Sequence, residues 1–178
     1  MIEYGSHNSV TGYEGKGFIS KLLTPFARCQ TKTLTKQVEA GVRYFDIRIK
    51  YHKGGFVLCH GLWISKLSVI NCFNILDFIG IYTTIYVDIT LETNSHVNDY
   101  LKYCKMLKDT YENIHIANIN VKKPVWKNLV NYLHIRAINK FITLDGSSWH
   151  TLIPIPWLWN KIYKFKYEDG YINIIDFV

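Results

Sequence analysis

Two kinds of segment alternate along almost the whole chain, and this alternation constrains the fold more than any other feature. Short runs rich in β-branched and aromatic residues predict strands at residues 2–4, 42–49, 56–59, 85–91, 114–116, 141–144 and 171–178. Apolar residues at helical spacing predict helices at residues 33–40, 68–78, 98–108 and 125–132. Seven strands joined by crossovers favour an α/β fold with a largely parallel sheet or barrel.

Several residues mark where the helices begin and end. Gly41 is expected to stop the first helix, and Ser68 and Asn98 are expected to be N-caps. The chain has no low-complexity linker and no internal repeat. Its 178 residues are enough for one sizeable core but too few for two ordinary ones, so we treat residues 1–178 as a single domain.

The composition excludes two broad classes of protein. Hydrophobic residues make up 48% and charged residues 20%, which is typical of globular chains and excludes disorder as the main state. The richest apolar segment, residues 57–89, is interrupted by polar and charged residues, so no run reaches the roughly 18 to 20 residues of a membrane span. The first five residues lack the basic-then-apolar layout of a secretory signal. We therefore expect a cytoplasmic protein, with membrane association only at the surface.

Charge and cysteine content set weaker bounds on partners. Subtracting 14 acidic from 21 basic residues gives a net charge of +7, which favours nucleic acid or an anionic membrane as partner. The lysines are scattered, which is typical of a solvated basic surface, and no nucleic-acid-binding motif is present. The four cysteines show neither CxxC nor zinc-site spacing, which predicts reduced thiols and no structural zinc.

Polar side chains follow three of the predicted strands. His7 follows the first strand, Asp46 and Arg48 lie near the end of the second, and His60 closes the third. Asp176 lies near the end of the last strand. In a parallel α/β barrel the carboxyl ends of the strands meet at one rim, where catalytic side chains converge. The sequence therefore predicts that these residues form one site.

These motifs resemble those of a known family. The segments GSHNS at residues 5–9, GVRYFDIR at 41–48 and CHGL at 59–62 resemble the X domain of phosphatidylinositol-specific phospholipase C. Within that superfamily the chain is most similar to the X-domain-only and bacterial members, and YINIIDF at 171–177 resembles their last barrel strand. The resemblance implies a TIM-type parallel β/α barrel.

The resemblance implies an attack by the inositol 2-hydroxyl on its own phosphodiester, with diacylglycerol as the leaving group. His7 would accept the hydroxyl proton and His60 would protonate the leaving oxygen, which imidazole can do near neutral pH. Asp176 would orient His7, and Arg48 would stabilise charge on the phosphoryl oxygens. Asp46 would position the catalytic side chains without itself contacting the substrate.

The resemblance also bears on metal and substrate binding. The calcium-dependent animal members carry an acidic metal ligand where this chain has Arg48, so we expect no metal and no other cofactor. Asn8 stands where bacterial and X-domain-only relatives usually carry an aspartate that supports the second histidine, which predicts a slow enzyme. Thr90 and Glu92 fall near family residues that bind inositol or metal, and we assign them with Asn8 to substrate binding.

The chain is short for a complete barrel of this type, which uses about 250 residues and rarely fewer than about 200. Between residues 144 and 171 relatives have a further strand and helix, whereas here residues 157–167 are the only connection. We therefore predict a truncated barrel of about seven strands. Its exposed edges favour self-association into a homo-oligomer.

Several residues have alternative interpretations that the sequence leaves open. Asp46 and Arg48 can form a structural ion pair, and Asp176 can simply cap the last strand. The apolar residues of segment 18–26 fit either a membrane-touching helix or the core, and Trp149, Trp157 and Trp159 fit either interfacial anchors or burial. The remaining histidines are expected to be surface residues: His52, His96, His115, His134 and His150.

Three classes of function follow from these observations. The first is an active phosphatidylinositol-cleaving phosphodiesterase, which the retained histidines and Arg48 favour. The second is a weak or inactive relative that binds phosphoinositide headgroups, which Asn8 and the truncation favour. The third, a nucleic-acid-binding module, rests on charge alone, so we expect a lipid partner and no nucleic acid. A glycerophosphodiesterase-like barrel would need an acidic metal cluster that the sequence does not reveal.

Overall fold

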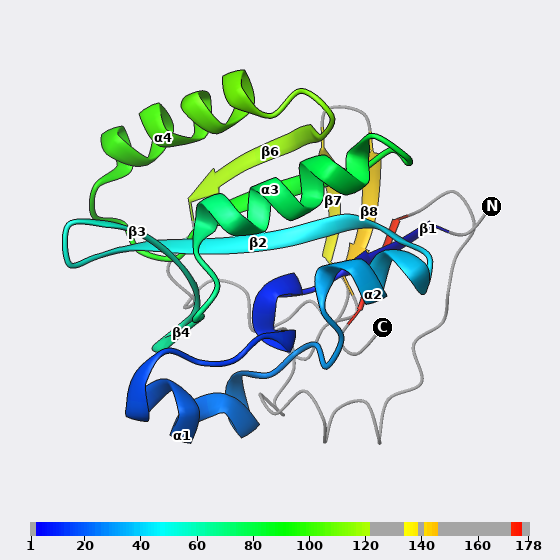
Figure 1. The fold of residues 1–178 in the computed structure, drawn as a ribbon. Helices are drawn as coiled ribbons and strands as arrows, with labels where there is room; N and C mark the ends of the chain where they lie inside the picture. Colours follow the sequence, from blue (N-terminus) through cyan, green and yellow to red (C-terminus); the bar gives the residue numbers. More distant parts are fainter. Residues whose placement is uncertain (1–2, 122–133, 139–140, 146–171, 176–178) are drawn as a thin grey trace.

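The structure is a computed structural model that describes residues 3–121, 134–138, 141–145 and 172–175 (Figure 1). Its strands are β1 (Glu3–Ser6), β2 (Val42–His52), β3 (Gly55–His60), β4 (Trp63–Ile64), β5 (Tyr86–Leu91), β6 (His115–Val121), β7 (His134–Ile138), β8 (Phe141–Asp145) and β9 (Ile172–Ile175). Its helices are the 3₁₀ helix η1 (Ser9–Gly12) and the α-helices α1 (Gly17–Ala27), α2 (Leu34–Glu39), α3 (Val69–Gly80) and α4 (Val97–Thr110).

The strands form one mixed sheet around a parallel centre. Neighbouring strands pair in parallel in the order β8, β9, β1, β2, β5 and β6. Three pairs are antiparallel: β2 with β3, β3 with β4, and β7 with β8. The α/β class is therefore confirmed. Among the described strands β6 pairs only with β5, so the described part of the sheet is open at that edge.

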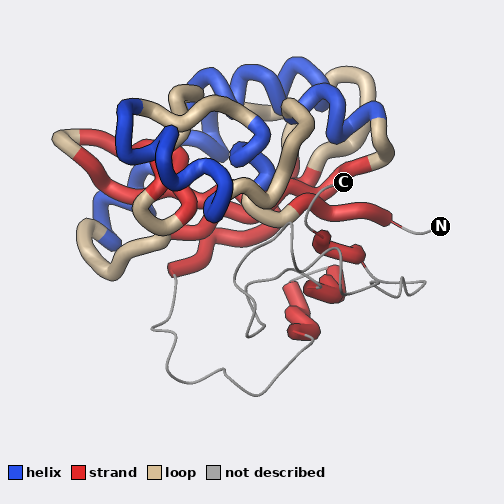
Figure 2. The backbone as a smooth tube through the Cα atoms, turned by 90° about the horizontal axis from the view of Figure 1, so that it is seen from below, coloured by secondary structure: helices blue, strands red, loops and turns tan. Residues whose placement is uncertain are grey.

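The two faces of the sheet differ in polarity because side chains alternate along each strand. On β2, Phe45, Ile47 and Ile49 are fully buried in a core that includes apolar residues of α3 and α4. Asp46 and Arg48 alternate with them and point to the other face. Figure 2 shows the helices largely on one side of the strands. The helix-covered face is thus the apolar core, and the opposite face carries the polar residues.

The predicted direction of β3 is wrong. The sequence predicted strands joined by crossovers, but β3 returns antiparallel beside β2. Only Lys53 and Gly54 connect the two strands, and both have positive φ, of 47° and 89°. A connection this short makes a hairpin, whereas a parallel pair needs a crossover of a dozen or more residues. His60 therefore reaches the site at the end of a hairpin strand.

The helix boundaries agree with the sequence except at α4. Ser68 caps α3 by accepting a hydrogen bond from the Asn71 backbone N–H, and α2 ends before Gly41, as predicted. The N-cap of α4 is His96, not Asn98, because the helix already begins at Val97. Strands β4 and β7 were not predicted. The predicted helix at 125–132 lies outside the described residues.

Two further expectations concern the cysteines and the membrane. Cys29, Cys59, Cys72 and Cys104 are free and buried, which confirms the predicted thiols. Within the described residues, the helices are all too short or too polar to cross a bilayer.

The close approach of η1 to the segment after α1 generates a stability prediction. A Cβ atom on Gly12 would overlap the backbone carbonyl oxygen of Lys32, so Gly12→Ala should lower the free energy of unfolding by about 1 to 3 kcal/mol. Urea denaturation at pH 7 measures the change. The control is Gly55→Ala, where an added Cβ meets no atom within 4 Å. Equal stability of the two variants would contradict the packing argument.

Candidate active site

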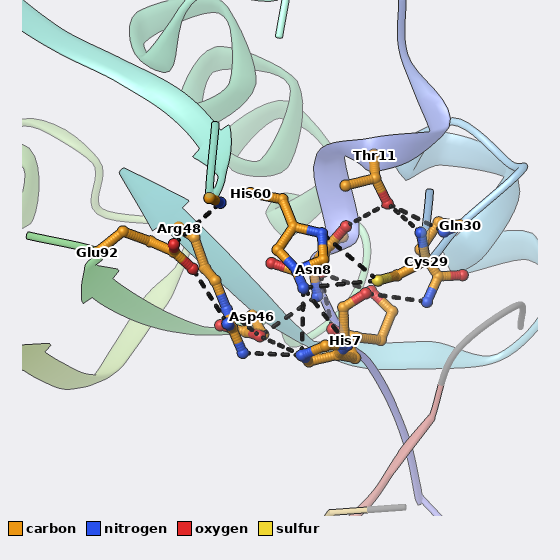
Figure 3. Close-up of polar contacts among 12 residues, drawn as sticks. His7, Asn8, Thr11, Cys29, Gln30, Asp46, Arg48, His60 and Glu92 are labelled. Carbon is orange, nitrogen blue, oxygen red and sulfur yellow. Dashed lines mark hydrogen bonds and ion pairs between the residues drawn. The ribbon is translucent and has the colours of Figure 1, made fainter. Parts of the chain in front are cut away.

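A cluster of polar residues, most of them buried, gathers around Asp46 and Arg48 (Figure 3). Its members come from four parts of the chain: His7 and Asn8 follow β1, Asp46 and Arg48 lie on β2, His60 ends β3, and Glu92 follows β5. The parallel register of β1, β2 and β5 brings these segments to one level of the sheet. Six of the residues predicted from separate motifs are therefore brought together.

The Arg48 guanidinium is at the centre of this cluster. Its Nε donates to Asp46 Oδ2 at 3.0 Å, its Nη1 to Glu92 Oε1 at 3.1 Å, and its Nη2 to His7 Nε2 at 2.8 Å. The side chains of Arg48, Asp46 and Glu92 are 7%, 8% and 4% exposed. The predicted Asp46–Arg48 ion pair exists, but it is one part of a larger network that also contacts His7.

The contact with Arg48 fixes the tautomer of neutral His7. A guanidinium can only donate hydrogen bonds, so Nε2 of neutral His7 is the acceptor and Nδ1 carries the proton. Asp46 Oδ2 lies 3.8 Å from the same Nε2. His7 is 1% exposed, so its ring has little room to turn. The basic lone pair of His7 therefore points at the positive charge of Arg48.

Asn8 is held by its backbone in a left-handed conformation, with φ of 47°. Its N–H donates to Asp46 Oδ2 at 3.3 Å, and its carbonyl accepts from Thr11. Its side-chain Nδ2 lies 3.2 Å from His7 Nε2 and 3.5 Å from Cys29 Sγ. The buried Oδ1 has no hydrogen-bond partner in the described part of the chain. Asn8 is thus fully buried beside His7.

His60 lies close to His7 and is oriented by the end of α1. The ring centroids are 6.2 Å apart and the planes are nearly perpendicular, at 81°. His60 Nδ1 donates to the Ala27 carbonyl at 2.7 Å, and Cys29 Sγ lies 3.8 Å from the same nitrogen. Because the carbonyl requires a proton on Nδ1, the neutral and charged forms of His60 differ at Nε2.

Burial lowers the pKa of His60 from 6.5 to about 4, and the positive charge of Arg48 and the electrostatic interaction with His7 act in the same direction. The Ala27 carbonyl and Glu92 partly oppose this shift. His60 is therefore neutral at pH 7 in the unliganded protein. A negatively charged ligand beside the ring would favour its protonation.

Thr90 and Glu92 differ in their relation to the cluster. Thr90 is in register with Arg48 on the neighbouring strand, so it lies on the same face. Glu92 contacts Arg48 with one carboxylate oxygen and accepts the Gly61 N–H with the other, at 3.0 Å. Asp176, Trp149, Trp157 and Trp159 lie outside the described residues. The sequence analysis missed Cys29 and the Ala27 carbonyl, because no pattern marks a backbone acceptor or a lone thiol.

Helix α1, which ends at Ala27, presents a large apolar surface. Phe18, Ile19, Leu22 and Phe26 are exposed by 80%, 68%, 65% and 59%, so the alternative that placed them in the core is wrong. Leu23 packs against the core, and Ala27 at the end of the helix is part of it. Of the other histidines, His52, His96 and His115 are exposed, as predicted. His134 and His150 lie outside the residues whose side chains are described.

Comparisons with known proteins relate this arrangement to one family. Residues 17–130 match the family model for the X domain of phosphatidylinositol-specific phospholipase C. The match includes Asp46, Arg48, His60, Thr90 and Glu92 but begins after His7. A search of curated protein sequences finds no significant match.

Solved structures with a similar fold come from two bacteria. The phosphatidylinositol-specific phospholipase C of Listeria monocytogenes is 21% identical with a TM-score of 0.63, over 99% of this chain and 87% of that one. A Staphylococcus aureus enzyme of the same name is 14% identical with a TM-score of 0.65, over 99% and 85% of the two chains. A further S. aureus structure, from work on modulating its membrane binding, is 16% identical with a TM-score of 0.53, over 80% and 59%.

The low pKa of His60 predicts a pH dependence of stability. His60 titrates at about 4 when folded but near 6.5 when unfolded, so the unfolded chain binds more protons between these values and stability falls as pH drops from 6.5 towards 4. A pKa shift of this size corresponds to a change of about 3 kcal/mol in the free energy of unfolding. Because solvent contacts part of the ring, we expect a loss of about 2 kcal/mol.

Urea denaturation at pH 7 and pH 4.5 tests this. We expect the wild type to lose more stability between the two values than His60→Gln, because carboxylate titrations are common to both proteins. Parallel pH profiles would show that His60 is not held in its neutral form.

Proposed function

The chain belongs to the phosphatidylinositol-specific phospholipase C X-domain family, and from that premise we propose that it cleaves phosphatidylinositol or a related phosphodiester. The reaction is acid–base catalysis by His7 and His60, and it uses no metal. The observation that carries the proposal is the pair of perpendicular imidazoles 6.2 Å apart, one of them bonded to a buried arginine.

Each histidine carries out one proton transfer in the proposed reaction. The inositol 2-hydroxyl replaces the Arg48 N–H as donor to His7 Nε2, and that nitrogen takes the hydroxyl proton as the oxygen attacks phosphorus. The bond to the diacylglycerol oxygen breaks, and protonated His60 gives its Nε2 proton to the leaving oxygen. The products are a cyclic inositol phosphate and diacylglycerol. The tautomers set by Arg48 and Ala27 support this assignment of base and acid.

The negative charge of the substrate favours the protonated form of His60, which the unliganded protein does not hold at pH 7. With a pKa of about 4 the ring is neutral at pH 7, but a bound phosphodiester anion lies against it and favours the charged form. Proton uptake by His60 therefore accompanies substrate binding. The same anion contacts Arg48, which stabilises charge on the phosphoryl oxygens.

Metal independence rests on the position of Arg48. Its guanidinium lies between the carboxylates of Asp46 and Glu92, at 3.0 and 3.1 Å, where a cation would otherwise be held. Among the described residues, no three His, Cys, Asp or Glu side chains are grouped as a metal site, which also counts against a glycerophosphodiesterase-like centre.

Asp176 keeps its proposed role as the orienting carboxylate. Strands β1 and β9 are parallel, with Ser6 opposite Ile175. In the sequence, His7 follows Ser6 and Asp176 follows Ile175. The pairing of Ser6 with Ile175 supports the orienting role that the family resemblance gives to Asp176.

The substrate is a membrane lipid, and we propose that α1 docks on the bilayer. Its exposed apolar residues adjoin a hollow of about 470 Å³ whose charged lining residues are Lys16, Lys21, Lys66 and Glu14. Glu14 pairs with Lys66 at 3.1 Å, so Lys16 and Lys21 give the hollow its net positive charge. Apolar side chains bordered by lysines suit the interface of an anionic membrane. A truncated barrel, self-association along its edges and a cytoplasmic location at the membrane surface remain parts of the proposal.

A second candidate is a weak or inactive relative that binds phosphoinositide headgroups. The observation that favours it is Asn8, whose neutral amide stands where related enzymes carry a carboxylate. Such a protein would keep Arg48 and α1 for binding but lack efficient proton transfer.

The two candidates differ in the effect of histidine substitution. Incubation with phosphatidylinositol vesicles, followed by phosphorus detection of cyclic inositol phosphate, should show activity that a chelator does not reduce. His7→Ala and His60→Ala should each lose about 10²-fold or more, because each removes one proton transfer. His115→Ala, on an exposed ring, is the matched control. Full activity in either site variant contradicts the mechanism, and no activity in the wild type favours the binding-only candidate.

Vesicle sedimentation tests the role of α1. The double variant Phe18→Ser/Leu22→Ser should bind phosphatidylinositol vesicles about tenfold or more weakly, because two exposed apolar side chains are lost from the docking face. Leu101→Ser, on α4 and 48% exposed, is the control and should bind like the wild type. Equal loss in both proteins would mean that α1 has no special role.

A further inference from the structure

We infer that Glu92 is a positioning residue. It joins the Arg48 guanidinium to the turn that follows His60 and thereby sets the distance between the guanidinium and the His60 ring. The sequence analysis assigned Glu92 to substrate binding, as the family resemblance implied. The inference concerns the role of Glu92 within the proposed mechanism and rests on that mechanism for its catalytic meaning.

The two oxygens of Glu92 contact two different parts of the chain. Oε1 accepts from Arg48 Nη1 at 3.1 Å, and Oε2 accepts from the Gly61 backbone N–H at 3.0 Å. The Glu92 side chain is only 4% exposed. Figure 3 shows the carboxylate beside Arg48, with a second contact directed to the end of β3. One buried carboxylate thus connects β2 to the residue next to His60.

The Gly61 backbone is held from a second side. Lys50 Nζ donates to the Gly61 carbonyl at 2.7 Å, so the N–H and the carbonyl of one residue are bound by opposite charges. Leu62, the other residue between β3 and β4, is 77% exposed and gives the turn little apolar anchorage. The contacts of Glu92 and Lys50 therefore hold the backbone of this turn in addition to the pairing of His60 with Trp63 across it.

The position of His60 follows from that of its neighbour. Its ring is held by the Ala27 carbonyl through Nδ1, and its backbone is held through Gly61. Among the described residues, the groups that interact with the ring include Arg48, His7, Cys29, Glu92 and the Ala27 carbonyl. The Glu92 carboxylate favours the charged ring, so Glu92 acts on His60 both by geometry and by charge.

Nuclear magnetic resonance of the substrate-free protein tests the inference without relying on activity. In Glu92→Gln, exchange of the Gly61 amide proton should become about tenfold or more faster, and the His60 titration should move to lower pH. Lys50→Met should speed the same exchange with a smaller effect on the His60 titration, because Lys50 does not contact Arg48 in the described network. Glu112→Gln, on an exposed carboxylate, is the matched control.

Kinetics separate the two roles of Glu92 where the protein is active. A positioning residue predicts that Glu92→Gln lowers kcat about tenfold or more and changes KM less than about threefold, with an altered pH profile. A substrate-binding residue predicts a raised KM and an unchanged pH profile. Unchanged Gly61 exchange and His60 titration in Glu92→Gln would overturn the inference, whereas an inactive wild type with both signals altered would overturn the proposed reaction alone.

Discussion

The site depends on one buried cation, the guanidinium of Arg48, and on the three groups that satisfy it. Asp46 lies on the same strand, Glu92 follows β5, and His7 follows β1, so the network forms only when β1, β2 and β5 pair in their parallel register. Removing a partner would leave a charge buried in a region of low dielectric, which is far more costly than losing a surface ion pair. The alternation that puts Ile47 in the core puts Asp46 and Arg48 on the opposite face, so fold and site share one constraint.

Much of this arrangement could be predicted from the sequence, because it follows from local patterns. The strands at β2 and β5, the Ser68 cap and the convergence of His7, Arg48 and His60 were all predicted. The direction of β3 was not, because apolar alternation is the same in parallel and antiparallel strands, and only the Lys53–Gly54 connection distinguishes them. The exposure of α1 was left open for a similar reason, since apolar residues at helical spacing suit a core face or a docking face. The Ala27 carbonyl leaves no trace in the sequence.

In the proposed mechanism, the charges around His60 explain how a ring with so low a pKa can act as the acid. Burial and Arg48 disfavour the imidazolium, and a bound substrate with a negative charge would favour it. Arg48 lowers the pKa of His60 in the free protein, and in the proposed mechanism it also contacts the substrate anion that favours protonation of that ring. Asp46 and Glu92 hold the guanidinium in place and neutralise part of its charge. Without them, the positive field on His60 would be stronger still.

The same physical terms separate a phosphodiesterase from a protein that only binds its lipid. In the proposal, binding depends on the exposed apolar residues of α1 and on the fixed positive charge of Arg48. Cleavage requires in addition a lone pair on His7 and a proton on His60 Nε2, and both depend on hydrogen bonds that set the tautomers. Asn8 bears on both requirements. Its backbone N–H holds the loop after β1 against Asp46, whereas its neutral side-chain amide supplies no charge to an imidazolium. The rate of proton transfer, and not the strength of lipid binding, is therefore the property that Asn8 limits in the proposed mechanism.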